Sequence, residues 1–157
     1  MKEIIGKPFK NITRAADMLC LHIGENIVKN INNKERIVSE FSFHIQIQWR
    51  FIQNNTILLA SRDIYEPYDE NVPDDWDYDI VGRAKEESSI FDVLNDEIVS
   101  LLKNTIITDC YVSPLGDLKI LFSNGVVFET FTSTSRKEEV WRFINFTSGE
   151  HTVIFDD

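Results

Sequence analysis

Cysteine is scarce in this chain of 157 residues, which contains only Cys20 and Cys110. Two cysteines cannot build the disulfide framework that staples small secreted domains, so a hydrophobic core must hold the fold together. Both lie in apolar, strand-like runs, where a thiol packs as a small hydrophobic group. The chain also lacks a Cys-x-x-Cys motif, a His-Glu-x-x-His motif and a glycine-rich phosphate loop. We therefore identify no catalytic residue, no metal site and no cofactor, and the sequence favours a non-enzymatic protein.

Long apolar runs are missing as well. The longest stretches, residues 57–60 and 98–102, are far too short to cross a bilayer. The first eleven residues carry three lysines and no apolar stretch of the length found in a signal peptide. We expect a soluble, cytoplasmic protein without membrane association. With 43% hydrophobic and 27% charged residues, the chain 1–157 is expected to form a single domain with an ordinary core.

Basic residues are few in the second part of the chain. Residues 1–62 contain nine bases and five acids, a net charge of +4, whereas residues 63–157 contain seven bases and twenty-one acids, a net charge of −14. The segment 66–79 alone has seven acids and no base. A field of this sign repels phosphate backbones, so we expect no nucleic-acid binding and favour basic proteins or cations as partners. The alternative is that the acids only keep the protein soluble.

What the sequence does contain is a long alternation of apolar and polar residues. From Phe41 to Phe51 every odd position is large and apolar, and the even positions between them are polar. Side chains of a strand point to opposite faces with period two, so residues 41–52 are predicted to form one strand with a dry and a hydrated face. Such a strand is typical of an antiparallel sheet.

Other segments complete the expected fold. Further strands are predicted at residues 17–23, 56–61, 105–112, 118–123, 126–132, 140–146 and 152–155, with turns at Asn32-Asn33, Asn54-Asn55 and Ser148-Gly149. One helix is predicted between Ser89, with Asp92 completing a capping box, and a stop at Asn104. We predict an α+β fold in which one antiparallel meander sheet of about six to eight strands carries this main helix on one face.

Asn124-Gly125 is the strongest short hairpin signal in the chain, and it predicts a two-residue type I′ loop. That loop would pair Ile120 with Glu129 and place Glu129 on an otherwise apolar face. Because a buried carboxylate is costly, we expect Glu129 to have a partner, to lie at the sheet margin or to have a raised pKa. Both a structural and a functional carboxylate fit this pattern.

The segment 64–87, called the acidic loop below, is the first candidate site. Its prolines and clustered aspartates oppose helix and strand. Aromatic side chains among acids are good anchors for a basic partner. The candidate partner-binding residues are Tyr68, Asp74, Asp75, Trp76, Asp77, Tyr78 and Asp79. Alternatively, Trp76 folds back and covers the edge of the core. A calcium loop that starts at Asp75 is disfavoured, because the glycine required at its sixth position is Ile80.

The hydrated face of the long strand is the second candidate site. The residues that could bind a small molecule there are His44, Gln46, Gln48 and Arg50, together with Glu129. The alternative is that this row is simply the solvated side of the sheet. Cys20 and His22 share one face of the strand 17–23 with Met18, and we interpret that face as core rather than as a catalytic Cys–His pair.

Short motifs along nearly the whole chain resemble a family of small, uncharacterised bacterial cytosolic proteins. They are Gly6-Lys7-Pro8-Phe9, Arg14-Ala15-Ala16-Asp17-Met18-Leu19, Gln48-Trp49-Arg50, Ser61-Arg62-Asp63-Ile64-Tyr65-Glu66-Pro67, Trp76-Asp77-Tyr78-Asp79, Ser89-Ile90-Phe91-Asp92, Gly116-Asp117-Leu118, Asn124-Gly125 and Trp141-Arg142. The resemblance supplies no catalytic residues. Size and acidity also resemble the immunity proteins that neutralise bacterial toxins. Our leading hypothesis is an interaction protein with a basic protein partner, and the rival is a small-molecule-binding domain or enzyme that uses the polar sheet face.

Overall fold

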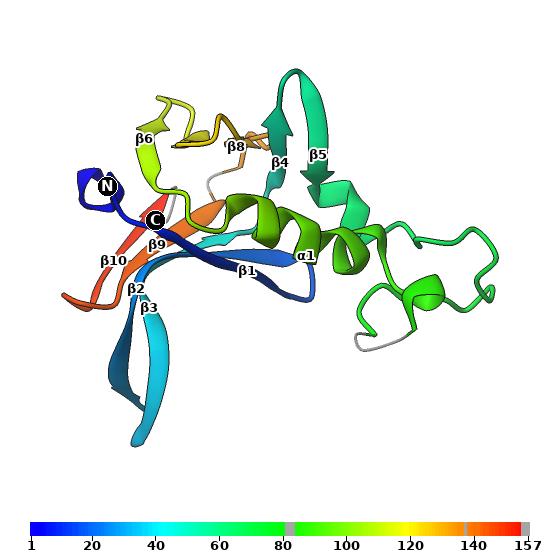
Figure 1. Ribbon diagram of the computed structural model, residues 1–157, viewed down its shortest axis with the longest axis horizontal. Helices are drawn as coiled ribbons and strands as arrows, with labels where there is room; N and C mark the ends of the chain where they lie inside the picture. The colour runs from blue at the N-terminus through cyan, green and yellow to red at the C-terminus, as the bar shows by residue number, and fades with distance from the viewer. Residues whose placement is uncertain (81–83, 137, 155–157) are drawn as a thin grey trace.

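Ten strands and one α-helix occur in the part of the chain that the computed structural model describes, residues 1–80, 84–136 and 138–154 (Figure 1). The first sheet has the order β1 (Phe9–Ala15), β2 (Met18–Ile31), β3 (Lys34–Ile45), β9 (Trp141–Asn145) and β10 (Glu150–Ile154). The second has the order β5 (Thr56–Ala60), β4 (Gln48–Gln53), β8 (Val127–Phe131), β7 (Leu118–Phe122) and β6 (Ile107–Val112). The helix is α1 (Ile90–Leu102), and the short 3-10 helices are η1 (Lys2–Ile4), η2 (Ser61–Ile64) and η3 (Lys85–Glu87). The predicted α+β class with antiparallel pairing is confirmed, but the single sheet of six to eight strands is wrong.

The long alternating segment is the reason for that difference. Instead of one strand over 41–52, β3 ends at Ile45 in the first sheet and β4 begins at Gln48 in the second. Between them the Gln46 N–H bonds to the Val140 carbonyl at 3.0 Å. Alternation survives the bend because both strands bury their odd-numbered side chains in the same interior, with Phe43 and Phe51 completely buried. A period of two indicates which face of a strand is buried, but it does not indicate where the chain bends from one sheet into another.

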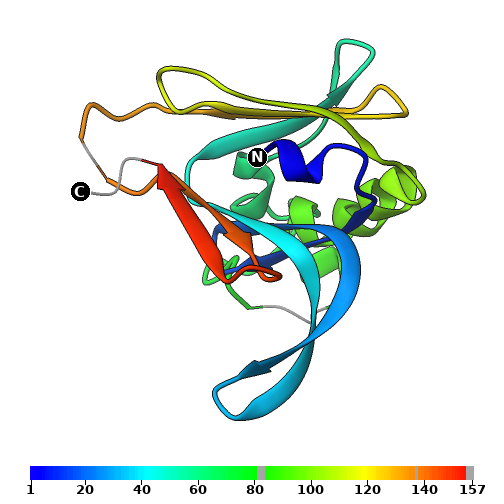
Figure 2. The ribbon, with the colours of Figure 1, turned by 90° about the vertical axis from the view of Figure 1, so that its left-hand side faces the viewer.

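Two asparagine pairs form the turns that the sequence predicts. Asn32 and Asn33 have φ values of 52° and 59°, and Asn54 and Asn55 have values of 51° and 61°. Positive φ at both central residues is the type I′ geometry, which matches the twist of the flanking strands. The first pair joins β2 to β3 in a hairpin that extends well away from the sheets, as Figures 1 and 2 show.

The loop at Asn124-Gly125 is longer than predicted. The Gly125 N–H bonds to the Phe122 carbonyl and the Phe122 N–H bonds to the Val126 carbonyl, so Ser123 joins the loop as a third residue. Only Gly125 in this loop has a positive φ, at 85°, as in a type I turn followed by a bulge. The register therefore shifts by one residue, and Glu129 pairs with Lys119 rather than with Ile120. A shift by one moves every side chain to the other face, so Glu129 leaves the apolar face.

Aromatic side chains from both sheets fill the interior between them. Trp49 and Phe51 of the second sheet pack on Phe128 of the same sheet, while Phe43 of the first sheet packs on Trp141. The indole N–H of Trp141 donates to the Gly116 carbonyl at 2.7 Å, which ties the first sheet to the β6–β7 turn of the second. None of the helices in the described residues is long and apolar enough to cross a membrane.

The helix α1 contacts β1 and β5, the edge strands of the two sheets, and so closes one side of the interior (Figures 1 and 2). As predicted, the Ser89 hydroxyl accepts the Asp92 N–H, at 3.1 Å, and Asn104 beyond the helix has a φ of 64°. Strand β1 was not expected from the sequence, because its burial is irregular and only Phe9 and Ile12 are buried. As an edge strand it covers little core, and the alternation that predicts a strand is absent.

Candidate functional site

The acidic loop is closed at its base by backbone hydrogen bonds. The Tyr68 N–H donates to the Ser88 carbonyl at 2.8 Å, and the Ile90 N–H donates to the Glu66 carbonyl at 2.9 Å. The described residues between them, 69–80 and 84–87, lie beside the start of α1 and extend away from the sheets (Figure 1). A loop with joined ends keeps a definite position on the protein, so its tip can carry function.

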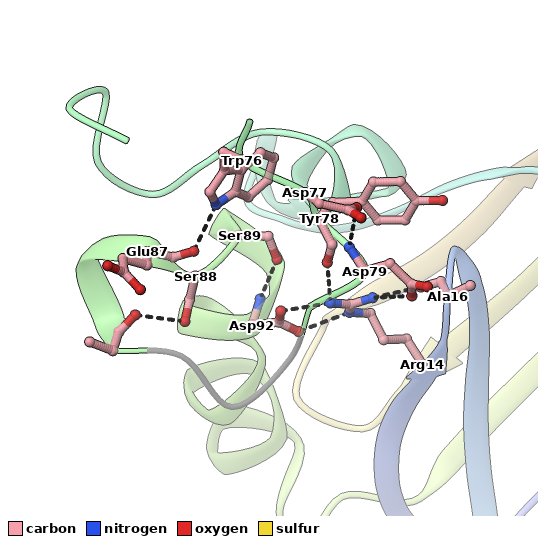
Figure 3. Close-up of polar contacts among 11 residues, drawn as sticks. Arg14, Ala16, Trp76, Asp77, Tyr78, Asp79, Glu87, Ser88, Ser89 and Asp92 are labelled. Atoms are coloured by element: carbon pink, nitrogen blue, oxygen red, sulfur yellow. Dashed lines mark hydrogen bonds and ion pairs between the residues drawn. The ribbon is translucent and has the colours of Figure 1, made fainter. Parts of the chain in front are cut away.

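Arg14, on the first sheet, binds the part of this loop at Tyr78 and Asp79. The Arg14 side chain on β1 is only 4% exposed, and it donates two hydrogen bonds to the Asp92 carboxylate, at 2.9 and 2.8 Å (Figure 3). It also donates to the carbonyls of Tyr78 and Ala16, both at 2.8 Å, and lies 4.0 Å from the Asp79 carboxylate. The hydrogen bonds to Asp92 raise the pKa of the guanidinium. A planar donor with five N–H groups suits such a junction of helix, strand and loop.

Arg14 was missed at the sequence level. Asp92 was expected to complete a capping box with Ser89, and its carboxylate is bound by this arginine instead. Nothing in the local sequence pairs Arg14 with Asp92, which lies 78 residues further along the chain. The sequence contains only a weak indication that Asp92 has a basic partner, because an aspartate in a capping box needs one if its charge becomes buried.

The aromatic side chains of the loop play different structural parts. Trp76 is half-buried, and its indole N–H donates to the Glu87 carbonyl at 2.7 Å, so this ring folds back onto the loop itself (Figure 3). Tyr78 packs against the core instead and meets the Tyr65 ring edge-on at 4.7 Å. Tyr68 is 43% exposed, with the Lys85 ammonium 4.8 Å from its ring centre. Trp76 therefore folds back onto the loop, and the residue that reaches the core is Tyr78. Partner binding by Trp76 stays a prediction.

Tyr65 connects the acidic loop to the β1–β2 turn. Its hydroxyl donates to the Asp17 carboxylate at 2.7 Å, while its ring remains 45% exposed. Partial burial, with the hydrogen bond to Asp17 as a second cause, raises the pKa of Tyr65 to about 12. This tyrosine therefore stays protonated at every physiological pH and acts as a permanent donor.

The aspartates of the loop point to solvent. Asp74, Asp75, Asp77 and Asp79 are all exposed. The Asp77 carboxylate accepts the Asp79 N–H at 2.9 Å, which fixes the local turn. In the described part of the chain, Asp74, Asp75 and Asp77 form no ion pair, and no group of three potential ligands could hold a metal ion. Residues 81–83, in the middle of the disfavoured calcium loop that would start at Asp75, lie outside the described residues.

The predicted polar row on the long strand is dispersed by the bend. His44 lies on the first sheet and lines a cavity there, whereas Gln46 and Gln48 line a second cavity at the corner between the sheets. Arg50 lies further along, on the second sheet, beside Phe131. His44 is thus separated from the other three residues of the row, whereas Gln48 and Arg50 still line one cavity on the second sheet.

Glu129 has a charged partner, as one of the predicted alternatives required, but its side chain lies on the outer face of the sheet rather than on the apolar face. Its carboxylate accepts a hydrogen bond from the Arg50 Nε at 2.7 Å, and the Lys119 ammonium lies 3.9 Å away. Arg50, Glu129 and Lys119 are direct neighbours on β4, β8 and β7. The group is a cross-strand ion network on the outer face of the second sheet, where such pairs stabilise the ladder.

Cys20 and His22 share one strand face, as predicted, but that face is not the core. The residues alternating with them, Leu19, Leu21 and Ile23, are completely buried between the sheets. Cys20 lies outside, 8% exposed and covered by its neighbours on the sheet, and burial raises the pKa of its thiol. A thiol with a raised pKa is a poor nucleophile at neutral pH, so nothing here resembles an activated cysteine.

Comparisons with known protein families, with curated proteins and with solved structures gave no match. The function of this protein must therefore be inferred from the chemistry of its own surface. The anchored acidic loop and the cavity on the first sheet both differ from an ordinary solvated exterior.

Proposed function

We propose that this protein is a non-enzymatic interaction module whose acidic loop binds a basic protein. One observation supports the proposal above the others: hydrogen bonds hold the described part of the loop in place while its aspartates stay exposed. Arg14 holds the backbone at Tyr78, and Trp76 bonds to the loop's own backbone. The charges of Asp74 and Asp75 are not neutralised by any other described residue.

Order in the free loop favours tight binding. A loop that is already held in place loses less conformational entropy when a partner binds, so more of the contact energy appears as affinity. A cluster of one sign of charge also attracts a partner of the opposite sign and speeds the encounter. The exposed ring of Tyr68 lies beside the charges and supplies the apolar contact that such interfaces need.

The partner class follows from this chemistry. A protein with a basic surface and an apolar residue at its centre would fit the acidic loop. A bacterial toxin domain neutralised by an immunity-like protein is one partner of this kind. The same charge excludes a nucleic-acid backbone as the ligand of this loop.

The test is a double substitution, Asp74→Asn with Asp75→Asn, which removes two charges from side chains that form no ion pair with another described residue. The matched control is Glu35→Gln with Asp96→Asn, which removes two charges from exposed side chains of β3 and α1. Wild-type protein is used to capture basic proteins from the native extract at low and high salt. The association rate of the captured protein is then measured with each variant.

We expect the loop variant to associate several-fold more slowly at low salt, with a weaker dependence of rate on salt, because steering by charge is lost. The control variant is expected to associate at nearly the wild-type rate. If both variants associate equally slowly, only net charge matters. If neither is slower than the wild type, charge plays no part in the association. Either result would reject the acidic loop as the binding surface.

A further inference from the structure

The outer face of the first sheet carries a row of side chains that the acidic loop does not involve. Strand pairing places Asn11 of β1, His22 of β2, Ser42 of β3 and Ile144 of β9 side by side. His44 lies two residues from Ser42 on the same face of β3. This surface is independent of the proposed function.

Ser42 is the shortest side chain of this row and lies between larger ones, and the outer face of the sheet has a cavity at this place. A cavity of about 450 Å³, called the sheet-face cavity here, is lined by Lys10, Asn11, His22, Ser42, His44 and Phe146, among others. A volume of this size lies within the range of small-molecule sites. Phe146 is fixed at its rim by a bond from its N–H to the Glu40 carbonyl, at 2.8 Å.

A bend in β2 shapes one end of this hollow. The pairing of β2 with β3 shifts between Ile23 and Asn26, and Gly24 in that bulge has a φ of 89°. Its N–H donates to the Pro8 carbonyl at 2.8 Å, which fixes the bend to the start of β1. A bulge increases the local twist and redirects the strand, here into the projecting hairpin.

Ser42 has a hydroxyl that the free protein leaves unsatisfied. The residue is 1% exposed, and its Oγ has no hydrogen-bond partner among the described residues. A buried hydroxyl without a partner destabilises the folded state, and an alanine would avoid that cost. Rotation about the single χ1 bond would bring the Oγ to a ligand atom that lies in the cavity.

The rest of the lining indicates the charge of the ligand. Lys10 supplies a positive charge, while none of the described residues that line the cavity is an aspartate or a glutamate. Burial lowers the pKa of both His22 and His44, so both imidazoles are neutral at neutral pH and each retains one N–H. Val38 and Phe146 add an apolar wall.

We propose that the sheet-face cavity binds a small organic carboxylate, with the carboxylate held by Lys10 and Ser42 and the apolar part packed on Val38 and Phe146. The carboxylate oxygens are acceptors and can take hydrogen bonds from the Ser42 hydroxyl and the Lys10 ammonium. His22 Nε2 already bonds to Thr13 Oγ1, at 2.9 Å. A ring or short alkyl chain next to the carboxylate displaces water from the apolar wall.

The first test uses the three histidines of the chain as reporters in two-dimensional NMR spectra. Benzoate is the probe, with benzamide as its neutral counterpart and inorganic phosphate as an anion without an apolar part. At constant pH, benzoate is expected to shift the ring signals of His22 and His44, which line the cavity, more than those of His151, which lies beyond Ile144 at the end of the same row. Benzamide and phosphate are expected to give much smaller shifts. No shift with benzoate, or equal shifts with all three compounds, would overturn the proposal.

The second test separates a binding role of Ser42 from a structural one. Ser42→Ala removes only the unpaired oxygen, so it is expected to raise the melting temperature of the free protein while weakening benzoate binding roughly tenfold. Lys10→Gln is expected to weaken binding a few-fold, whereas Lys34→Gln at the exposed hairpin tip leaves it unchanged. If Ser42→Ala binds benzoate as the wild type does, the serine is not part of a site and the proposal fails.

Discussion

The acidic loop and the outer face of the first sheet are both polar, but they are held in place by different means. The sheet face is fixed by backbone ladders through β1, β2, β3 and β9, which need no particular side chain. The loop has almost no ladder and depends on a few long-range side-chain contacts, above all those of Arg14. A surface almost without strand or α-helix can therefore be held in place when one buried cation connects several elements.

Removal of that cation is expected to have the largest effect on the loop. Arg14→Met keeps the aliphatic stem but leaves the Asp92 carboxylate without its main partner, and we expect the free energy of unfolding to fall by about 3 kcal/mol. Trp76 should become more accessible, because its loop is no longer held at Tyr78. Urea unfolding measures the first effect and acrylamide quenching of tryptophan fluorescence measures the second.

Arg62→Met is the matched control for this experiment. Arg62 also pairs with a carboxylate, that of Glu66 at 3.2 Å, but its side chain is 83% exposed. An exposed pair of this kind contributes about 0.5 kcal/mol or less. If the two arginine variants lose similar stability, the loop is held by its other contacts and the comparison is mistaken.

The next largest effect is expected on the sheet side, at Gly24. A Cβ added there would lie 2.6 Å from Glu40 Oε2 and 2.8 Å from Glu40 Cβ, and φ is 89°. We expect Gly24→Ala to cost about 2 kcal/mol, from backbone strain and from displacement of Glu40, which also bonds to Lys7. Thermal and urea unfolding measure the loss.

Gly149→Ala isolates the backbone part of that cost. Gly149 has a φ of 78°, and nothing lies within 4 Å of an added Cβ. Its replacement is expected to cost about 1 kcal/mol from the positive φ alone. A loss at Gly24 no larger than that at Gly149 would mean that the contact with Glu40 relaxes freely and that the bend of β2 is not tightly determined.

The same contrast explains what could be predicted from the sequence. The features that depend on only a few neighbouring residues were predicted correctly. They are the turns at Asn32-Asn33 and Asn54-Asn55 and the cap at Ser89. Their φ preferences and hydrogen bonds involve neighbours in the chain, so the residue types suffice. The antiparallel class was also correct, because alternation depends on which side of a strand is buried.

Features that depend on distant segments were missed or wrong. The corner at Gln46 divides one predicted strand between two sheets, and the third loop residue Ser123 shifts Glu129 to the other face. The partnership of Arg14 with Asp92 has no local signature. For the same reason the sheet-face cavity could not be foreseen, because it exists only once β1, β2, β3 and the residue after β9 are brought together.

The smallest expected effect is a pH dependence that belongs to the sheet face. Burial lowers the pKa of His22 and His44 in the folded protein, whereas an unfolded histidine has a pKa near 6.5. Below about pH 6.5 the unfolded chain therefore binds more protons, so the stability these residues contribute is complete above that pH and is lost as pH falls toward their folded values. Glu40 also has a lowered pKa, through its hydrogen bond from Lys7, but its contribution is lost only at lower pH, below its unfolded value of 4.5.

Urea unfolding between about pH 8 and pH 5 would thus report the histidines apart from Glu40. We expect the free energy of unfolding to decline as the pH falls through this range. The NMR titration midpoints of His22 and His44 are expected to lie below the pKa of an unfolded histidine. High salt should leave both shifts largely in place, because their main cause is burial rather than neighbouring charge. Midpoints at or above the unfolded value would mean that solvent reaches these rings freely, and the sheet face would then be as open as the exposed acids of the loop.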